Sequence, residues 1–429
     1  MRRFLLLPCL LMAACSTGSA LSTSKKDRHL NPLTEIKADL AFTCVHEKIP
    51  TAAADVDVLF QYARWLQKNN LLKQDKTVDA QIERLYRIAS ENGHYKANIN
   101  LQNGSMRGRF KLRGAEYLRM SQQLIEAEVA TGYYFIAIFL QQGGAGLKQD
   151  EQMSLRYFRK AADYGSAQSQ RYVSERLAPI DIAPHVARQM RQCAAEQGNG
   201  DAAGALGVDF SIDRDFQAAL EALQLGVAAG DSTSASFLSK GFRNPPPSNE
   251  LHYLGQQEDL ERADRYKKIG DILSGYSYAK PTVPEINEIV PLPPAKLPAW
   301  DGKLQWLEAH RANIAPEQPS EALISQLAKA KLLDPATGRP MPGSPGFIQA
   351  IYPMQTCYSG QACPQTGYWQ VAGVIPRIYS VAEGESLSRF EQGEIMPTRM
   401  MATRNIRFLL PDKITVREEE VKWKLFGDA

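Results

Sequence analysis

The cysteines are the residues of this sequence with the clearest capacity for chemistry, because a thiol can form a disulfide or bind a metal. Cys357 and Cys363 bracket a short loop, TCYSGQACP, and are the candidate disulfide. Cys44 and Cys193 would have to meet across distant parts of the chain, so a second disulfide and two buried thiols both remain open. No Cys-x-x-Cys occurs and the six histidines are scattered, so we expect no metal site.

No complete catalytic motif is found either. The sequence lacks Gly-x-Ser-x-Gly, His-Glu-x-x-His and a phosphate-binding glycine loop. His46 and Lys48 have the spacing that begins a phospholipase D motif, but Ala53 stands where its aspartate is needed and no second copy occurs. We therefore expect a charged helix end here, no catalytic residue and no cofactor. A hydrolase with an unrecognised site is one alternative.

The first residues have the pattern of an export signal. Met1–Cys15, MRRFLLLPCLLMAAC, has two arginines, a short apolar run and two alanines before Cys15. This ending resembles a bacterial lipobox and predicts that Cys15 becomes the acylated first residue; cleavage after Ala14 or a few residues later is the alternative. Ser16 in place of aspartate favours the outer membrane, with the chain facing the periplasm. Residues 16–30 are polar and predict a tether.

The central part of the chain is repetitive. Leu155, Phe158, Ala161 and Ala162 recur at helical spacing, and Gly165 stops the pattern. The glycines at 132, 165, 198 and 230 follow one another at intervals of 33, 33 and 32 residues. Such a period with two helices per unit is the signature of a helical solenoid. Asp55–Lys68 predicts an amphipathic helix near its start, Asn103–Arg113 a loop, Ala178–Pro184 a second excursion, and Leu260–Leu273 the closing helix.

The pattern of Tyr133–Ala167 resembles the Sel-like repeat, a unit related to the tetratricopeptide repeat. The segments LAFTCVHE, GHYKANINLQ, YYFIAIFLQQG, RQMRQCAAEQG and VPEINEIVPLPPAKLPAWDGKLQWL resemble one bacterial group across roughly residues 30–335. This group consists of Sel-like repeat lipoproteins with a proline-marked C-terminal region of unassigned function. Its members are encoded beside type VI secretion effectors, and some resemble periplasmic immunity proteins of secreted phospholipases.

The remaining segments complete a mainly α architecture. The sequence predicts a lipoprotein signal over 1–15, a tether over 16–30, an α-solenoid over 31–278, a proline-rich connector over 279–300 and helices over 301–333. Apolar residues in the connector, from Val283 to Leu292, indicate that it lies extended along a surface. Gln305–Asn313 and Ser320–Leu333 predict two short helices, with Ser320 as an N-cap.

Residues 334–429 predict a small β-containing module. Phe347–Tyr352, Tyr368–Val371, Ile406–Leu410 and the final VKWKLFG are strand candidates. The segments SGQACPQTGYWQ and RFEQGEIMP resemble a module of other type VI-associated, immunity-like proteins. In those relatives a second cysteine often follows the tryptophan, whereas Val371 stands there in this chain, which puts the disulfide pairing in doubt.

A partner-binding surface is the functional expectation for this module. Trp369 is either a core aromatic residue or, with Tyr368, Arg389 and Phe390, a partner-binding anchor.

The sequence therefore predicts a non-enzymatic protein that binds another protein. Fifty basic and 47 acidic residues give a net charge of +3, which gives no electrostatic reason to expect nucleic acid. The resemblance implies an immunity protein that neutralises a type VI secretion effector, such as a phospholipase, by tight binding and occlusion. A cell-envelope scaffold that assembles the cell's own proteins is the main alternative.

Overall fold

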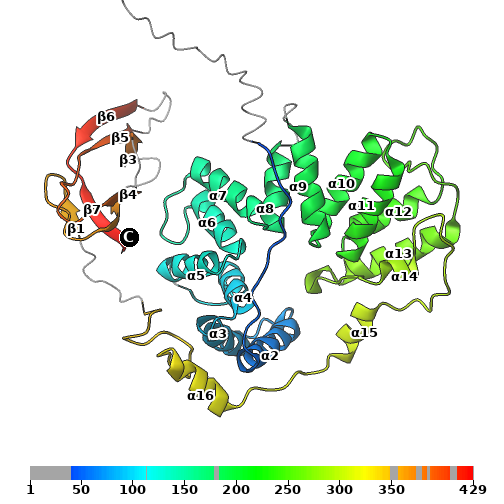
Figure 1. The fold of residues 1–429 in the computed structure, drawn as a ribbon, viewed down its shortest axis with the longest axis horizontal. Coiled ribbons are helices and arrows are strands. Elements are labelled where there is room, and N and C mark those ends of the chain that lie inside the picture. The colour runs from blue at the N-terminus through cyan, green and yellow to red at the C-terminus, as the bar shows by residue number, and fades with distance from the viewer. Residues whose placement is uncertain are drawn as a thin grey trace, which may run out of the picture. The chain divides into compact units, whose positions relative to one another are not determined.

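The structure is a computed structural model, which describes residues 40–112, 114–177, 183–347, 356–372, 379–383, 387–405 and 413–428 (Figure 1). The expected signal sequence, the tether and Cys15 lie outside these residues. So do most of the Ala178–Pro184 excursion and the expected strand at Ile406–Leu410. Within the described ranges, no helix has the length and apolar character needed to cross a membrane.

A series of helices packed against their neighbours in the chain makes up most of the structure. They are α2 (Ala54–Asn70), α3 (Lys76–Glu91), α4 (Tyr95–Met106), α5 (Gly114–Glu126), α6 (Thr131–Gln142), α7 (Glu151–Asp163), α8 (Ala167–Leu177), α9 (Pro184–Glu196), α10 (Gly200–Ile212), α11 (Phe216–Ala228), α12 (Ser232–Gly241) and α13 (Leu260–Gly275). This is the predicted α-solenoid of helix pairs. The expected loop at Asn103–Arg113 starts later, because α4 continues to Met106.

The local sequence explains where most of these helices start and stop. Side chains of Asp75, Asp150 and Asp231 accept hydrogen bonds from backbone N–H groups in the first turns of α3, α7 and α12. Gly165, just after α7, adopts a positive φ that few other residues tolerate. Phe158, Ala161 and Ala162 are buried as the α7 pattern requires, whereas Leu155 is 40% exposed.

One glycine of the repeat has a different role from the one expected. Gly132 does not stop a helix but lies in the first turn of α6. A β-carbon at Gly132 would lie 2.6 Å from the Ser121 carbonyl oxygen, so the glycine permits close packing of α5 and α6. The turn before α6 is made by Glu128, which itself has a positive φ of 59°.

The proline-rich connector packs on the last repeat and then reaches the first. Its apolar residues Val283, Ile286 and Val290 join the core formed by α11, α12 and α13. It is not extended throughout, because Ile286–Ile289 forms the short helix α14. After α15 (Gln305–Ala312), the Asn313 carbonyl accepts a hydrogen bond from Trp65 Nε1 in α2, at 3.3 Å.

The next helix, α16 (Glu321–Ala330), holds this part of the chain against the first helices of the solenoid. Ser320 caps it as predicted, since its side chain accepts a hydrogen bond from the Leu323 N–H. Leu327 packs in one core cluster with residues of α2, α3 and α4, and its carbonyl accepts a hydrogen bond from Asn92 Nδ2 at 3.1 Å. Residues 280–330 therefore bridge the two ends of the solenoid.

The C-terminal module is built from two small antiparallel sheets. The first has the strand order β1 (Thr356–Tyr358), β7 (Lys422–Asp428), β2 (Gly367–Val371), β4 (Leu387–Phe390), and the second the order β3 (Tyr379–Glu383), β5 (Arg399–Asn405), β6 (Lys413–Glu419). Strands β2 and β7 confirm two predicted strands. Phe347 lies in no strand.

Candidate functional site

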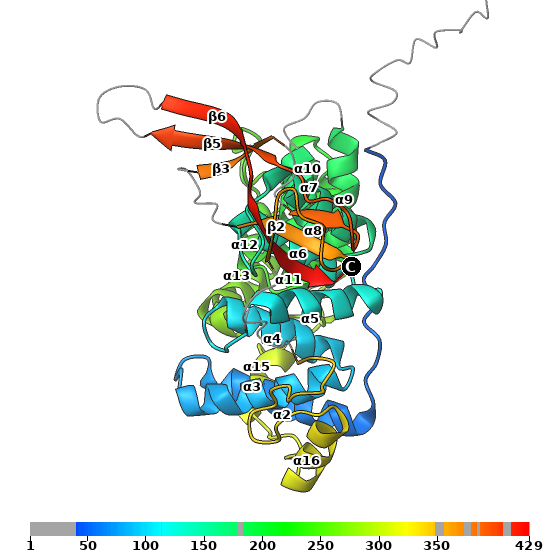
Figure 2. The ribbon, with the colours of Figure 1, turned by 90° about the vertical axis from the view of Figure 1, so that its left-hand side faces the viewer.

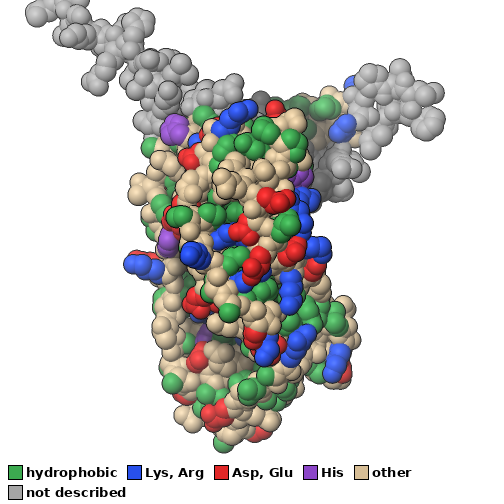
Figure 3. All heavy atoms as spheres, turned by 90° about the vertical axis from the view of Figure 1, so that its right-hand side faces the viewer, with side chains coloured by type: hydrophobic (Ala, Val, Ile, Leu, Met, Phe, Trp, Pro, Cys, Tyr) green, Lys and Arg blue, Asp and Glu red, His purple; other side chains and the backbone are tan. Residues whose placement is uncertain are grey.

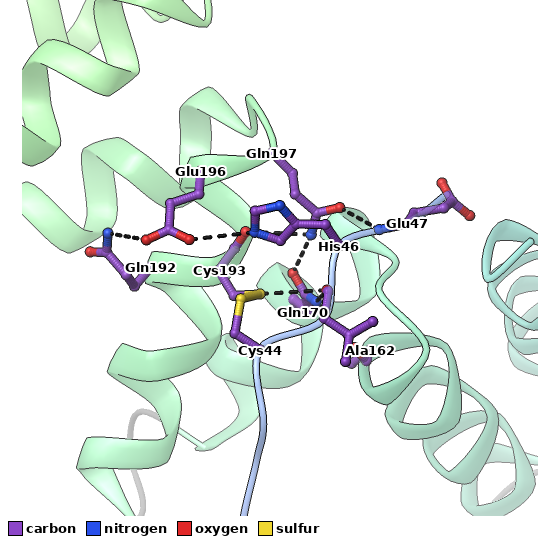
Figure 4. The surroundings of a disulfide bond; sticks show 10 residues. Cys44, His46, Glu47, Ala162, Gln170, Gln192, Cys193, Glu196 and Gln197 are labelled. Carbon is purple, nitrogen blue, oxygen red and sulfur yellow. Dashed lines mark hydrogen bonds and ion pairs between the residues drawn. A yellow bond between two sulfur atoms is a disulfide. The ribbon is translucent and has the colours of Figure 1, made fainter. Parts of the chain in front are cut away.

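Residues 42–53 form an extended segment, here named the strap, that contains no helix until α2 begins. Its contacts join it to α6, α8 and α9. The Val45 carbonyl accepts a hydrogen bond from Gln170 Nε2 at 2.9 Å, and the Glu47 N–H donates to Gln197 Oε1 at 2.9 Å. Figure 2 shows the strap passing along the helices, and Figure 4 shows these side chains around it. The side chains of Gln170 and Gln197 therefore supply hydrogen bonds that a neighbouring strand would otherwise give to the strap backbone.

A disulfide fastens the strap to α9. It joins Cys44 to Cys193, with a Cα–Cα distance of 5.5 Å. The candidate pair from the sequence, Cys357 and Cys363, is not bonded: both are buried free thiols in the core of the β module. Their sulfur atoms instead donate to the carbonyls of Ala362 and Gln365. The short loop between them was the reason for expecting a bond, but in the structure the two thiols face different backbone acceptors.

The charged helix end that the sequence predicted around Glu47 is not formed, because this residue lies in the extended strap. Its carboxylate accepts hydrogen bonds from the Thr131 N–H at 2.6 Å and the Thr131 hydroxyl at 3.0 Å, at the start of α6. The carboxylate thus satisfies an amide that has no partner within its own helix. Burial raises the pKa of Glu47, and the two hydrogen bonds from Thr131 oppose that rise. His46 and Glu47 therefore have a structural explanation that needs no catalysis.

Replacing Glu47 by glutamine should flatten the pH dependence of stability. The pKa of Glu47 is higher in the folded chain than its ordinary value of 4.5. Its contribution to stability is therefore fully present below that value and is lost as the pH rises through the folded pKa. Urea unfolding at about pH 4 and about pH 7 should show Glu47→Gln gaining stability relative to the native chain.

Glu321→Gln is the matched control, because a hydrogen bond from Arg84 lowers the pKa of that carboxyl. This variant should lose stability relative to the native chain over the same pH range. Equal slopes for the two variants would contradict the assignment of Glu47.

Gly165→Ala should loosen the strap. A β-carbon at Gly165 would lie 2.6 Å from the Glu47 nitrogen and 2.7 Å from the His46 carbonyl carbon. Gly198 has a similar positive φ, but nothing lies within 4 Å of its β-carbon position. Both substitutions carry the backbone cost of about 1–2 kcal/mol for a left-handed residue. Gly165→Ala should cost about 1–3 kcal/mol more in urea unfolding, because the strap must also move. Equal losses would show that the strap adapts freely.

The partner-binding residues expected in the β module do not form an exposed anchor. Trp369 is fully buried and Phe390 is 5% exposed, and both belong to the core that also contains Trp423. Trp369 Nε1 donates to the Gln365 carbonyl at 3.1 Å, so its polar atom has a partner inside the module. Arg389 is exposed and lies 3.3 Å from Glu391. The side chain of Tyr368 lies outside the described residues. Trp369 is therefore a core aromatic residue, which was the alternative to a partner-binding anchor in the sequence analysis.

Among the described histidines, His94 comes nearest to a catalytic arrangement. It is 4% exposed, and its Nε2 lies 3.0 Å from Asp57 Oδ1. Its Nδ1, however, accepts the Ala97 N–H at 3.1 Å and so caps α4. The ring also stacks on Phe60, with centroids 4.1 Å apart. With both ring nitrogens and one ring face occupied, His94 has a structural role.

An apolar groove is the clearest candidate for contact with another protein. It lies between α10, α11, α12 and the loop after α12, and its volume is ≈ 380 Å³. Its lining includes the side chains of Val208, Leu223 and Phe237. Two large hydrophobic residues at the groove are open to solvent: Ile212 is 74% exposed and Leu251 is 61% exposed. We name these residues the α10 groove. No sequence pattern marked it, because its residues come from three helices and a loop.

Figure 3 shows one face of the molecule in space-filling form. Positive and negative side chains alternate on it, with hydrophobic side chains between them. The mixture agrees with the near balance of basic and acidic residues in the sequence. On the face shown, charges of one sign do not gather into a single large patch.

Comparison with known proteins gives one family model and several solved structures. Residues 234–341 match the model "Domain of unknown function (DUF6396)", which covers α12, α13, the connector and α16. No curated protein matches the chain. Immunity protein PA5088 from Pseudomonas aeruginosa is similar, with 24% identity and a TM-score of 0.46 over 59% of this chain and 94% of that one. Immunity protein Pa5087 from the same organism has 24% identity and a TM-score of 0.45 over 59% and 95%.

A Sel1 repeat protein from Oxalobacter formigenes is also similar, with 18% identity and a TM-score of 0.34 over 51% of this chain and 97% of that one. These proteins are of the kinds that the sequence motifs indicated. The chain is a helix-pair solenoid that resembles Sel-like repeat and immunity proteins, and its residues 234–341 match the DUF6396 domain.

Proposed function

We propose that this chain is an immunity protein that binds a secreted effector and blocks it by occlusion. The observation that carries the proposal is the α10 groove, where Ile212 and Leu251 stand exposed beside an apolar hollow. Exposed apolar side chains clustered at a pocket are typical of protein-binding surfaces. A solenoid supplies the extended surface on which such a groove can meet a partner.

The immunity part of the proposal is supported by the sequence motifs. Their resemblance to lipoproteins encoded beside type VI secretion effectors points to a toxin as the partner. A phospholipase is the effector class we put first. Acylation at Cys15 would hold the protein at the outer membrane, facing the periplasm where the toxin acts. No catalytic step by this chain is needed, since occupying the mouth of the toxin's active site suffices.

Binding and protection test the proposal together. The chain from Ser16 onward, mixed with the secreted proteins of its own cell and the products of neighbouring genes, should form a one-to-one complex with a toxin. Co-expression with that toxin in a periplasm should restore growth. Recovery of resident envelope proteins alone, without protection, would overturn the proposal and favour the scaffold.

Single substitutions should locate the binding surface. Ile212→Asp and Leu251→Asp should each weaken the complex at least tenfold, because a charge would enter the apolar groove. Leu72→Asp is the matched control, since Leu72 is 70% exposed and lies outside the groove. Equal binding by all three variants in a calorimetric titration would place the interface elsewhere.

A further inference from the structure

The disulfide that fastens the strap lies beside a histidine. The ligand atoms of Cys44, Cys193 and His46 all lie within 4.8 Å of one another. Cys44 and His46 are exposed, whereas Cys193 is buried in α9 (Figure 4). The alternation of the strap brings Cys44 and His46 to the same side of its backbone, as expected for residues two apart in extended chain. Two sulfurs and an imidazole at one accessible place are a donor set for a soft divalent metal.

We propose that Cys44, Cys193 and His46 form a Zn²⁺ site when the disulfide is reduced. The same three residues thus have two states, a disulfide under oxidising conditions and a metal site under reducing ones. This proposal is independent of the effector-binding function.

The geometry requires only a small change. The two sulfur atoms are bonded to each other in the disulfide and separate when it is reduced. Tetrahedral zinc binds each thiolate at about 2.3 Å, which places two sulfurs about 3.8 Å apart. The Cα–Cα distance of 5.5 Å already lets both side chains reach one metal by rotation about their Cα–Cβ bonds. The strap therefore does not need to slide along α9 for both sulfurs to reach the metal.

Glu196 supplies the partner that a zinc-bound histidine usually has. Its Oε2 lies 3.4 Å from His46 Nε2, and Figure 4 shows the imidazole directed toward that carboxylate. A carboxylate that accepts the N–H of one ring nitrogen fixes the tautomer and leaves the other nitrogen free for the metal. Cys44, Cys193 and a ring nitrogen of His46 then make three ligands, and a water molecule completes the tetrahedron.

The chemistry balances with an external dithiol as the reductant. Two electrons and two protons pass from the dithiol to the disulfide, which leaves two thiols on this chain and a disulfide in the reductant. Zinc then displaces both thiol protons as it binds. An attacking thiolate would approach through Cys44, because that residue is exposed whereas Cys193 is fully buried. The strap remains fastened to α9 in both states.

Zinc binding by the reduced and oxidised chains tests this inference. The full mature chain is reduced with a phosphine, freed of reductant, and titrated with Zn²⁺ against a chromogenic chelator. The reduced chain should bind one equivalent and the oxidised chain none. Substitution with Co²⁺ should give a sulfur-to-metal charge-transfer band. No binding by the reduced chain, or equal binding by both forms, would overturn the proposal.

Variants separate this site from the other two thiols. Cys357→Ser should leave the binding unchanged, whereas Cys44→Ser should abolish the charge-transfer band of the one-to-one complex. If Cys44→Ser fails to fold, His46→Gln serves instead, because His46 is exposed; it should weaken zinc binding at least tenfold. Glu196→Gln should weaken it 10- to 100-fold. Loss of binding in Cys357→Ser, with His46→Gln unaffected, would assign the metal to the β module and overturn the proposal.

Discussion

Replacing both Cys44 and Cys193 by serine should lower the free energy of unfolding by about 2–5 kcal/mol. The disulfide joins residues 149 positions apart. In the chain-entropy model, closing a loop of that length in the unfolded chain contributes about 5 kcal/mol, and native-state adjustments reduce the observed value. The midpoint of urea unfolding, measured in the presence of a chelator so that no metal contributes, gives the loss directly.

The second cysteine pair provides the control for this prediction. Of the four cysteines that the structure describes, Cys357 and Cys363 are free thiols, so reduction of the chain from Ser16 onward should act through Cys44 and Cys193. Reductant should shift the midpoint of Cys357→Ser as much as that of the native chain, and should leave the double variant at 44 and 193 unchanged. Identical midpoints for oxidised and reduced native chain would show that the strap is held by its hydrogen bonds alone.

Patterns within one helix were readable from the sequence, whereas contacts between distant helices were not. The face of Phe158, Ala161 and Ala162 and the stop at Gly165 follow from local periodicity and backbone freedom. The pairing of Cys44 with Cys193 depends on how several repeats stack, and a small rotation in each repeat would separate the two thiols. The short spacing of Cys357 and Cys363 therefore gave the wrong pair.

The β module illustrates a second limit. The alternation in Tyr368–Val371 predicted the strand β2, but a strand has two faces, and one shift of register exchanges them. Which face Trp369 occupies is decided by β4 and β7, whose Phe390 and Leu425 pack in the same core. The residues of the α10 groove were missed for a related reason. These residues lie at ordinary helical positions, and the groove forms between them only when α10, α11 and α12 stack.

The connector sequence allows a more detailed prediction than the β module or the α10 groove, because its prolines change the backbone hydrogen bonding. A proline has no N–H, so the region from Pro291 to Pro298 is rich in carbonyls and poor in backbone donors. Carbonyls that pack against another part of the protein need hydrogen-bond partners. Two buried arginines of α13 supply them: Arg262 Nη2 donates to the Pro291 and Ala295 carbonyls at 3.0 and 2.8 Å. The apolar side chains of the connector predicted a surface contact, but not the donors beneath it.

Arg265→Ala should therefore destabilise the chain by about 2–4 kcal/mol. Arg265 is 8% exposed, and its guanidinium donates to the Ile289 carbonyl at 2.8 Å and to the Pro298 carbonyl at 2.7 Å. The substitution leaves two carbonyls without donors and also removes the cation that lies over Trp300, 5.9 Å from the ring centroid. Urea unfolding measures the loss, and hydrogen exchange should show earlier opening of α14 than of α2.

Lys267→Ala is the matched control on the same helix, since Lys267 is 62% exposed and pairs with Asp271 in the next turn. An exposed pair of this kind contributes little, so the control should stay within about 0.5 kcal/mol of the native chain. A similar small loss for Arg265→Ala would mean that water replaces the guanidinium at both carbonyls. The core residues Val283, Ile286 and Val290 would then hold the connector without help from the charged helix. A large loss of unfolding free energy in Arg265→Ala, but not in Lys267→Ala, would instead show that the arginine donors are required for the proline-rich connector to pack against the solenoid.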